Sequence, residues 1–243
     1  MRVGVYVDAY NLYYGGRSLC GRGASGWRWL DVRQLAWSIV RGRHSWQGAS
    51  VVRVVYCTAR IDARTNPAGY HDQDVYLKAL LASGSVDHIE YGNYATRTKK
   101  AMLAEVDSRG RPLIARSRWP VMVRDSSGLD VRDAQFMVQV LSMEEKGSDV
   151  NVAAHLLIDI ASSTVDAAVV ISNDSDLRLP IQYARSMTPV GTVNPRGGYL
   201  AGDLRGNAND GIGNHWWIQL TPEDFFGAQL PSPVGLYHRP KGW

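Results

Sequence analysis

The segment "VVISNDSDLRLP", residues 169–180, carries the residues best suited to chemistry. Asp174 and Asp176 stand one residue apart, directly after a run of apolar residues that is typical of a buried strand. Carboxylates crowded at the end of such a strand repel one another unless a cation neutralises them. Mg²⁺ or Mn²⁺ favours oxygen ligands of this kind. The spacing therefore favours a metal site, although an aspartate there is also a favoured helix N-cap.

Two further aspartates occupy equivalent positions. Asp8 ends the apolar stretch "RVGVYVD", and Asp149 lies in "EEKGSDVNVA" at a predicted helix start. In an open parallel sheet the functional crevice lies outside the carboxyl ends of the strands, so these side chains are expected to converge there. We expect Asp8, Asp149 and Asp174 to hold Mg²⁺ or Mn²⁺ directly or through water. Asp176 would bind a second ion.

The elements that must position these residues follow from the hydrophobic pattern. Predicted strands alternate with predicted helices, which indicates an α/β fold with a doubly wound, mostly parallel sheet and helices on both faces. The strands are expected at 2–8, 51–59, 88–97, 134–143, 166–172 and 189–195, with an edge strand at 216–221 and a short strand pair in the segment 98–133. The helices are expected at 29–42, 71–84, 149–162 and 178–187, the second with Asp72 as its N-cap. We expect one domain over 1–225 with a basic insertion at about 98–133, followed by a C-terminal tail, 226–243.

Composition narrows the class of protein. The chain has 243 residues, of which 45% are hydrophobic, enough for one sizeable core. Its two cysteines, Cys20 and Cys57, have no metal-ligand or disulfide spacing, and the histidines also lack ligand spacing. The N-terminal apolar run is too short for a signal peptide or a membrane span, so we expect a cytoplasmic protein without a membrane partner.

Positive charge concentrates in one segment. The net charge is +4, whereas residues 96–118 hold seven basic and two acidic residues, 7 − 2 = +5. This segment is either a phosphate-contacting arm or a solvated hairpin with charged sides. In the first case phosphates of a nucleic acid would contact Arg97, Lys99, Lys100, Arg116 and Arg118.

Aromatic residues are candidate partners for RNA bases. Tyr10 and Tyr13 follow Asp8 in what we expect to be a loop, where bases of a single strand can stack on their rings. Trp27, Trp29 and Trp119 stand beside arginines and could also reach a base.

Three blocks carry a family resemblance: "VYVDAYNLYYG", "EEKGSDVNVAAHLLID" and "DAAVVISNDSDLRLPIQYA". In this order they resemble the signature blocks of the NYN domain, a PIN-like ribonuclease fold, over roughly residues 1–195. The resemblance implies a metal-dependent endoribonuclease acting on single-stranded or loop RNA, with a site made by Asp8, Asn11, Asp149, Asp174 and Asp176. In such a site Asp176 would bind a second ion or orient the attacking water. Asn11 would position a water or a phosphate, or else shape the turn after the first strand. The basic insertion and the residues after about 196 depart from the family pattern, which leaves the substrate open.

Other function classes remain to be weighed. The chain could be a non-catalytic module that binds RNA or a protein, although such a module has no need of four mutually repelling carboxylates. A phosphatase of the haloacid dehalogenase type would need an aspartate at the position of Tyr10. A metal-free ribonuclease needs a histidine arrangement that the sequence does not reveal. A homo-oligomer or a regulatory partner is compatible with all of these.

Overall fold

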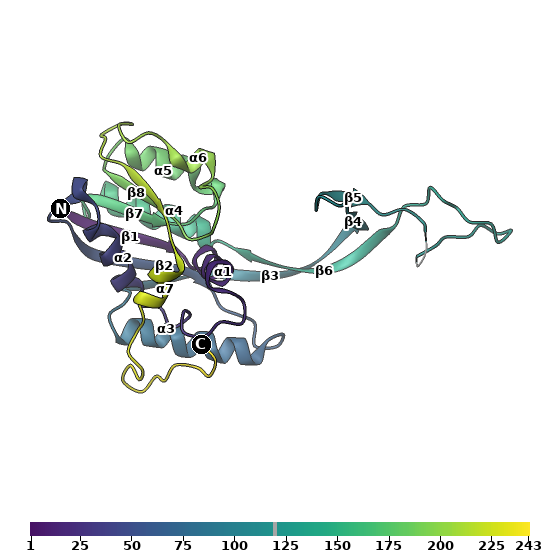
Figure 1. Cartoon of the computed structure of the whole chain (residues 1–243), viewed down its shortest axis with the longest axis horizontal. Helices are drawn as coiled ribbons and strands as arrows, with labels where there is room; N and C mark the ends of the chain where they lie inside the picture. Colours follow the sequence, from purple (N-terminus) through teal and green to yellow (C-terminus); the bar gives the residue numbers. More distant parts are fainter. Residues whose placement is uncertain (119–120) are drawn as a thin grey trace. The chain divides into compact units, whose positions relative to one another are not determined.

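A computed structural model describes residues 1–118 and 121–243 (Figure 1). The chain forms two compact units. The main unit contains Met1–Tyr94 and Glu145–Trp243, and the second unit is Ala95–Glu144. The four predicted metal-binding aspartates belong to the main unit, and the predicted RNA-contacting basic residues belong to the second.

A seven-stranded sheet with the order β6-β3-β2-β1-β7-β8-β9 organises the fold. Strand β1 pairs in parallel with both β2 and β7, and the pairs β2/β3, β7/β8 and β8/β9 are also parallel. The chain thus builds outward from β1 first in one direction and then in the other. The strands are β1 Arg2–Asp8, β2 Ser50–Ala59, β3 His88–Met102, β6 Met137–Lys146, β7 Ala167–Ile171, β8 Val190–Asn194 and β9 Trp216–Gln219.

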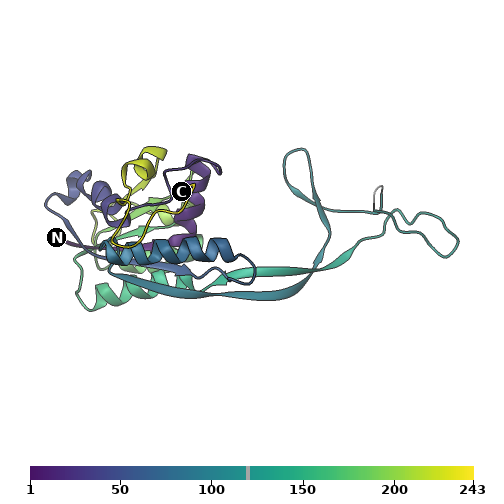
Figure 2. The same cartoon turned by 90° about the horizontal axis from the view of Figure 1, so that it is seen from below.

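Helices cover both faces of the sheet (Figure 1, Figure 2). One face packs against α1 Ala9–Cys20, α2 Val32–Arg41, α3 Pro67–Ala82 and α7 Pro222–Gly227; the other packs against α4 Ser148–Ala161, α5 Arg178–Arg185 and α6 Gly202–Arg205. Two 3₁₀ turns, η1 His44–Trp46 and η2 Ser175–Leu177, complete the elements of the main unit. The predicted α/β class, with its mostly parallel sheet and helices on both faces, is confirmed.

Alternation along each strand divides the apolar side chains between two cores. Val5 and Val7 of β1 belong to the core beneath α1, α2 and α3, whereas Tyr6 belongs to the core beneath α4 and α5. Successive strand residues point to opposite faces, so a strand buried on both sides reads as a continuous apolar run. The stretch "RVGVYVD" has this pattern for that reason.

Two helix boundaries differ from expectation. The residues after Asp8 form helix α1 rather than a loop, although Gly15 and Gly16 lower its intrinsic propensity. Gly15 is required by packing, since a Cβ there would lie 2.1 Å from the carbonyl oxygen of Pro195. Helix α3 is capped by Asn66, whose side chain accepts from the Gly69 N–H, and not by Asp72. Pro67 at the first helical position explains the earlier start.

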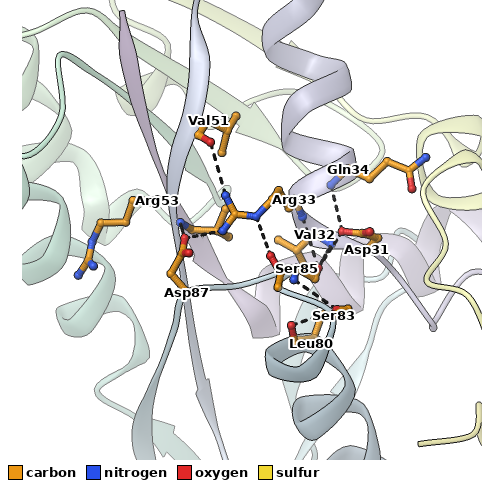
Figure 3. A network of polar contacts seen from close by, with 12 residues as sticks. Asp31, Val32, Arg33, Gln34, Val51, Arg53, Leu80, Ser83, Ser85 and Asp87 are labelled. Atoms are coloured by element: carbon orange, nitrogen blue, oxygen red, sulfur yellow. Dashed lines mark hydrogen bonds and ion pairs between the residues drawn. The ribbon is translucent and has the colours of Figure 1, made fainter. Parts of the chain in front are cut away.

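A polar network anchors the start of α2 to the neighbouring strands (Figure 3). Arg33 pairs with Asp87 at 2.6 Å, and the same carboxylate accepts from the Val54 N–H of β2. The Ser85 hydroxyl donates to Asp31, the N-cap of α2, and accepts from the Val32 N–H. The orphan N–H groups at this helix end are thereby satisfied.

The C-terminal segment packs on the main unit. Leu230 and Val234 are buried in the core beneath α2 and α3, and the ring of Trp243 lies 5.6 Å from that of Tyr76. Trp27 and Trp29 are also buried, which corrects the expectation that they could reach a base; Trp119 lies outside the described residues. Arg28 stacks over the Trp27 ring, so a neighbouring arginine does not require an exposed tryptophan.

The second unit contains the distal part of β3, the start of β6 and a two-stranded antiparallel sheet. This small sheet pairs β4 Ala104–Val106 with β5 Pro112–Ile114. Asp107 closes the connecting turn by accepting from the N–H groups of Arg109 and Arg111. The predicted basic insertion, 98–133, falls inside this unit.

Candidate active site

The ends of β1 and β7 bring predicted site residues to one edge of the sheet. The two strands are parallel neighbours, with Tyr6 opposite Val170 and Val7 opposite Ile171. Asp8 ends β1, and Asp174 follows β7 after a two-residue connection. The strand order reverses between β1 and β7, because β2 and β3 extend the sheet on one side and β8 and β9 on the other. Ligands of open α/β sheets bind at such a switch point.

Asp8 is buried and held by three hydrogen bonds. It is 3% exposed. One carboxylate oxygen accepts from the Asn11 backbone N–H at 3.0 Å, which makes Asp8 the N-cap of α1. The other oxygen accepts from the Asn11 side-chain amide at 2.6 Å and from the Ser172 hydroxyl at 2.9 Å. Asn11 thus donates to Asp8 through both its backbone N–H and its side-chain amide, which orients the carboxylate.

The electrostatics of Asp8 favour a nearby cation. Burial raises the pKa of Asp8, and the charge of Asp174 raises it further, whereas hydrogen bonds from Asn11 and Ser172 lower it. An ionised Asp8 is thus under repulsion that a bound cation would relieve. Asp8 and Asp174 form the electrostatically linked pair of this edge.

Ser172 and Asn173 shape the turn that carries the acidic pair. The Ser172 hydroxyl donates to Asp8 and accepts from the Asp174 N–H at 3.1 Å. Asn173 accepts from the Ala201 N–H at 2.7 Å, which ties the turn to the loop before α6. Asp174 caps η2 by accepting from the Asp176 N–H at 3.0 Å. Asp174 is half-buried and Asp176 is exposed.

Asp149 lies in the first turn of α4 and is half-buried. Helix α4 packs its buried Val152 and Leu156 on the core shared with β1 and β2. Within residues 1–118 and 121–243, no three of the four predicted aspartates bring their ligand atoms within 4.8 Å of one another. The edge is therefore acidic without being a closed cage of aspartates.

Glu145 is an acidic residue of this region that sequence reasoning missed. Its carboxylate accepts from the N–H and the hydroxyl of Ser148 at the start of α4. It lies over Gly92 of β3, where a Cβ would come within 2.9 Å of the Glu145 oxygen. Burial raises the pKa of Cys57, and the charges of Asp8, Glu90 and Glu145 add to that rise, so all three carboxylates lie near this thiol. The segment "EEKGSD" contains Glu145, but only its Asp149 was predicted to be a site residue.

A cavity of about 310 Å³ opens beside Asp8 in the main unit. Asp8 does not line it, but Ala9, the next residue, and Glu145 do. Burial, followed by the charge of Glu145, raises the pKa of Tyr94 to about 12. The aromatic lining consists of Tyr10, Tyr13, Tyr14, Tyr56, Tyr76, Tyr94 and Trp243.

Tyr10 and Tyr13 reach this cavity from α1. They are 42% and 40% exposed, so their rings are accessible to a ligand. The rings of Tyr10 and Tyr14 lie 4.4 Å apart, and that of Tyr13 lies 5.5 Å from Trp27. The helix thus presents an aromatic surface immediately after the buried carboxylate.

The basic residues of the second unit are largely paired with acids of the same unit. Lys99 pairs with Glu144, Arg116 with Asp133 at 3.1 Å, and Arg118 with Glu105. Arg97 and Lys100 are exposed and have no ion-pair partner among the residues that the structure describes. This pairing favours the charged-hairpin interpretation for the first three residues and leaves Arg97 and Lys100 as the better candidates for phosphate contacts.

Comparisons with known proteins give one distant curated relative. No family model matches the chain. The 6-hydroxy-3-succinoylpyridine 3-monooxygenase HspA of Pseudomonas putida is 29% identical over 214 residues, which cover 82% of this chain and 61% of that protein. A solved structure of a protein of unknown function from Vibrio parahaemolyticus RIMD 2210633 is 14% identical with a TM-score of 0.44, covering 92% of this chain and 94% of that chain. None of the described helices has both the length and the apolar character needed to cross a bilayer.

Proposed function

We propose that the chain is a metal-dependent endoribonuclease with the PIN-like fold of the NYN domain family, and that it hydrolyses phosphodiester bonds of single-stranded or loop RNA. One observation carries the proposal. The buried carboxylate of Asp8 is joined through the Ser172 hydroxyl to the Asp174 turn, at the switch point of the sheet and beside a cavity lined with tyrosines. This arrangement offers negative charge for a cation next to aromatic rings for a base.

The donor set fits Mg²⁺ or Mn²⁺. Asp8, Asp149, Asp174 and Asp176 offer only oxygen ligands, which these hard cations prefer. The repulsion that Asp174 exerts on Asp8 would also be relieved by the ion. When bound, the ion would lower the pKa of water and neutralise charge that develops on the phosphate.

The protein side chains would supply positioning. Asn11 and Ser172 fix the Asp8 carboxylate in one orientation through three hydrogen bonds. Tyr10 and Tyr13 would stack on a base beside the scissile phosphate, for about 1–3 kcal/mol per base. Asp176, exposed on η2, is free to orient the attacking water.

The direct test is incubation of the full chain with an RNA of mixed structure in Mn²⁺, Mg²⁺ or EDTA, with a matched single-stranded DNA alongside. The proposal expects cleavage of unpaired RNA in the metal buffers only. Binding of RNA without cleavage in any buffer would instead support a non-catalytic NYN-fold module. If the chain neither binds nor cleaves RNA, both the ribonuclease and the RNA-binding module are contradicted.

The second unit gives a prediction about RNA affinity. We expect the double substitution Arg97→Gln with Lys100→Gln to weaken RNA binding and to reduce the slope of log K against log salt by about 0.7 for each lost single-strand phosphate contact. The matched control is Arg116→Gln with Arg118→Gln, which removes equal charge from residues that already have acidic partners. An equal salt slope in wild type and both variants would make the whole segment a solvated hairpin.

A second candidate function is the binding of a small aromatic compound in the tyrosine-lined cavity. The cavity volume of about 310 Å³ and its aromatic lining are typical of small-molecule sites. The distant relative, whose name specifies a pyridine substrate, is 29% identical and supplies the probe. We infer that a hydroxypyridine ring would lie against Tyr10 and Tyr13.

This candidate predicts binding of 6-hydroxy-3-succinoylpyridine to the full chain in a calorimetric titration. Tyr10→Ala should weaken it about 3- to 10-fold, because an aromatic pair contributes about 0.5–1.5 kcal/mol beyond its buried area. Tyr183→Ala is the control, since Tyr183 is exposed on α5 and does not line the cavity. No heat of binding, or equal loss in both variants, would argue against it.

A further inference from the structure

We propose that His88, Glu90 and His155 form a binding site for a divalent transition metal ion, with Zn²⁺ as the ion that it fits best. It uses none of the aspartates assigned to the acidic edge around Asp8, and it does not depend on the proposed ribonuclease activity.

The three side chains converge on one point. The Nε2 atoms of His88 and His155 each lie 3.0 Å from the same carboxylate oxygen of Glu90. The ligand atoms of all three residues lie within 4.8 Å of one another, the sole grouping of this kind among the described residues. The sequence shows no ligand spacing for these histidines, and the fold supplies the proximity. Residues 88 and 155 are far apart in sequence, and no spacing rule links them.

The fold explains why these residues meet. His88 and Glu90 are alternate residues of β3, so their side chains point to the same face of the sheet. Their partners on β2 are Val55 and Cys57, both buried in the core beneath α4. His155 precedes Leu156, a residue through which α4 packs on that core. The helix thus sets an imidazole beside the two strand residues.

The geometry is close to that of a zinc site. A tetrahedral Zn²⁺ with ligand bonds of about 2.0–2.1 Å sets its ligand atoms about 3.3–3.4 Å apart. The two Nε2–Oε2 distances of 3.0 Å are close to this spacing, so small side-chain movements would admit the ion. Three protein ligands leave a fourth position for water or another ligand.

The ligands are accessible and chemically suited. The side chains of His88, Glu90 and His155 are 43%, 38% and 19% exposed, which gives the ion a path from solvent. Two imidazoles and one carboxylate suit Zn²⁺, Co²⁺ or Ni²⁺, whereas Mg²⁺ prefers an all-oxygen site.

The position indicates what a bound ion would do. It would join α4 to β3. Helix α4 carries Asp149 of the acidic edge, and β3 carries Gly92, next to which the Glu145 carboxylate lies. None of its three ligands lines the tyrosine-rich cavity. The ion would therefore act as a cross-link within the main unit rather than on a molecule in that cavity.

The test is a calorimetric titration of the full chain with Zn²⁺, together with thermal melts with and without the metal. Wild type should bind one equivalent in addition to any ion at the acidic edge, and saturating Zn²⁺ should raise Tm by about 5 °C or more. His88→Gln, Glu90→Gln and His155→Ala should each weaken this binding at least about tenfold. Glu90→Gln retains an oxygen acceptor for the histidines, so a purely hydrogen-bonded cluster would tolerate it.

Two controls separate this site from other sources of Zn²⁺ binding. His71→Ala removes an exposed histidine of α3, and Asp174→Asn alters the acidic edge; both should leave the binding in place. Co²⁺ bound to wild type should give the visible absorption of a four-coordinate ion, a readout that needs no variant. Absence of Zn²⁺ binding by wild type at micromolar concentrations, or binding unchanged in all three ligand variants, would overturn the proposal.

Discussion

Asp174→Asn is expected to reduce RNA cleavage at least about 100-fold while leaving the protein folded. Partners one step removed from a metal ion already contribute about 10- to 100-fold to affinity or activity, and Asp174 is proposed as a direct ligand. Asparagine retains an oxygen that can accept from the Asp176 N–H, so the cap of η2 is preserved. The substitution also removes the charge that raises the pKa of Asp8, so the metal-free protein should be as stable or more so.

The matched control is Asp166→Asn, which makes the same change next to the opposite end of β7. Asp166 pairs with Arg2 at 2.7 Å on the surface, and exposed ion pairs contribute little to stability. This variant should cleave RNA at the wild-type rate. Circular dichroism establishes folding for both variants, and cleavage is measured under single-turnover conditions. A folded Asp174→Asn protein with wild-type turnover would remove the acidic edge from the mechanism.

The second large effect concerns the requirement for metal and the chemistry of the products. EDTA should abolish cleavage, and the fragments should carry 5′-phosphate and 3′-hydroxyl ends. These ends follow if an activated water attacks phosphorus, because the ribose 2′-hydroxyl is then not the nucleophile. End-labelling and mass analysis of the fragments provide the measurement.

The rival mechanism uses the 2′-hydroxyl and leaves a 2′,3′-cyclic phosphate. The structure makes this rival more concrete than the sequence did, since the rings of His88 and His155 lie 5.2 Å apart. They do not line the tyrosine-rich cavity, whereas Ala9, the residue after Asp8, does. Cyclic phosphate ends, or cleavage that persists in excess chelator, would assign Asp8 and Asp174 to the support of the fold alone.

Local sequence patterns predicted most strands of the sheet, the helices α2 to α5 and the carboxylates at the strand ends, but not helices α1 and α7. Local patterns carry this information, because a doubly buried strand reads as an apolar run and Asp favours the position where a helix begins. "RVGVYVD" therefore predicted both β1 and the edge position of Asp8, and "VVISNDSD" did the same for β7 and Asp174. The expectations failed at α1, a helix where a loop was expected, and at the start of α3, where Asn66 and not Asp72 is the cap.

Only the tertiary structure decided which side chains meet. The pairing of β1 with β7 lets Ser172 join Asp8 to Asp174, and the absence of a side chain at Gly92 makes room for Glu145. Helix α4 brings His155 to Glu90 across the sheet. These contacts join residues that are distant in the chain, and they depend on strand order and helix packing. Hydrophobic periodicity and local propensity specify each element separately, so they carry no direct record of its neighbours.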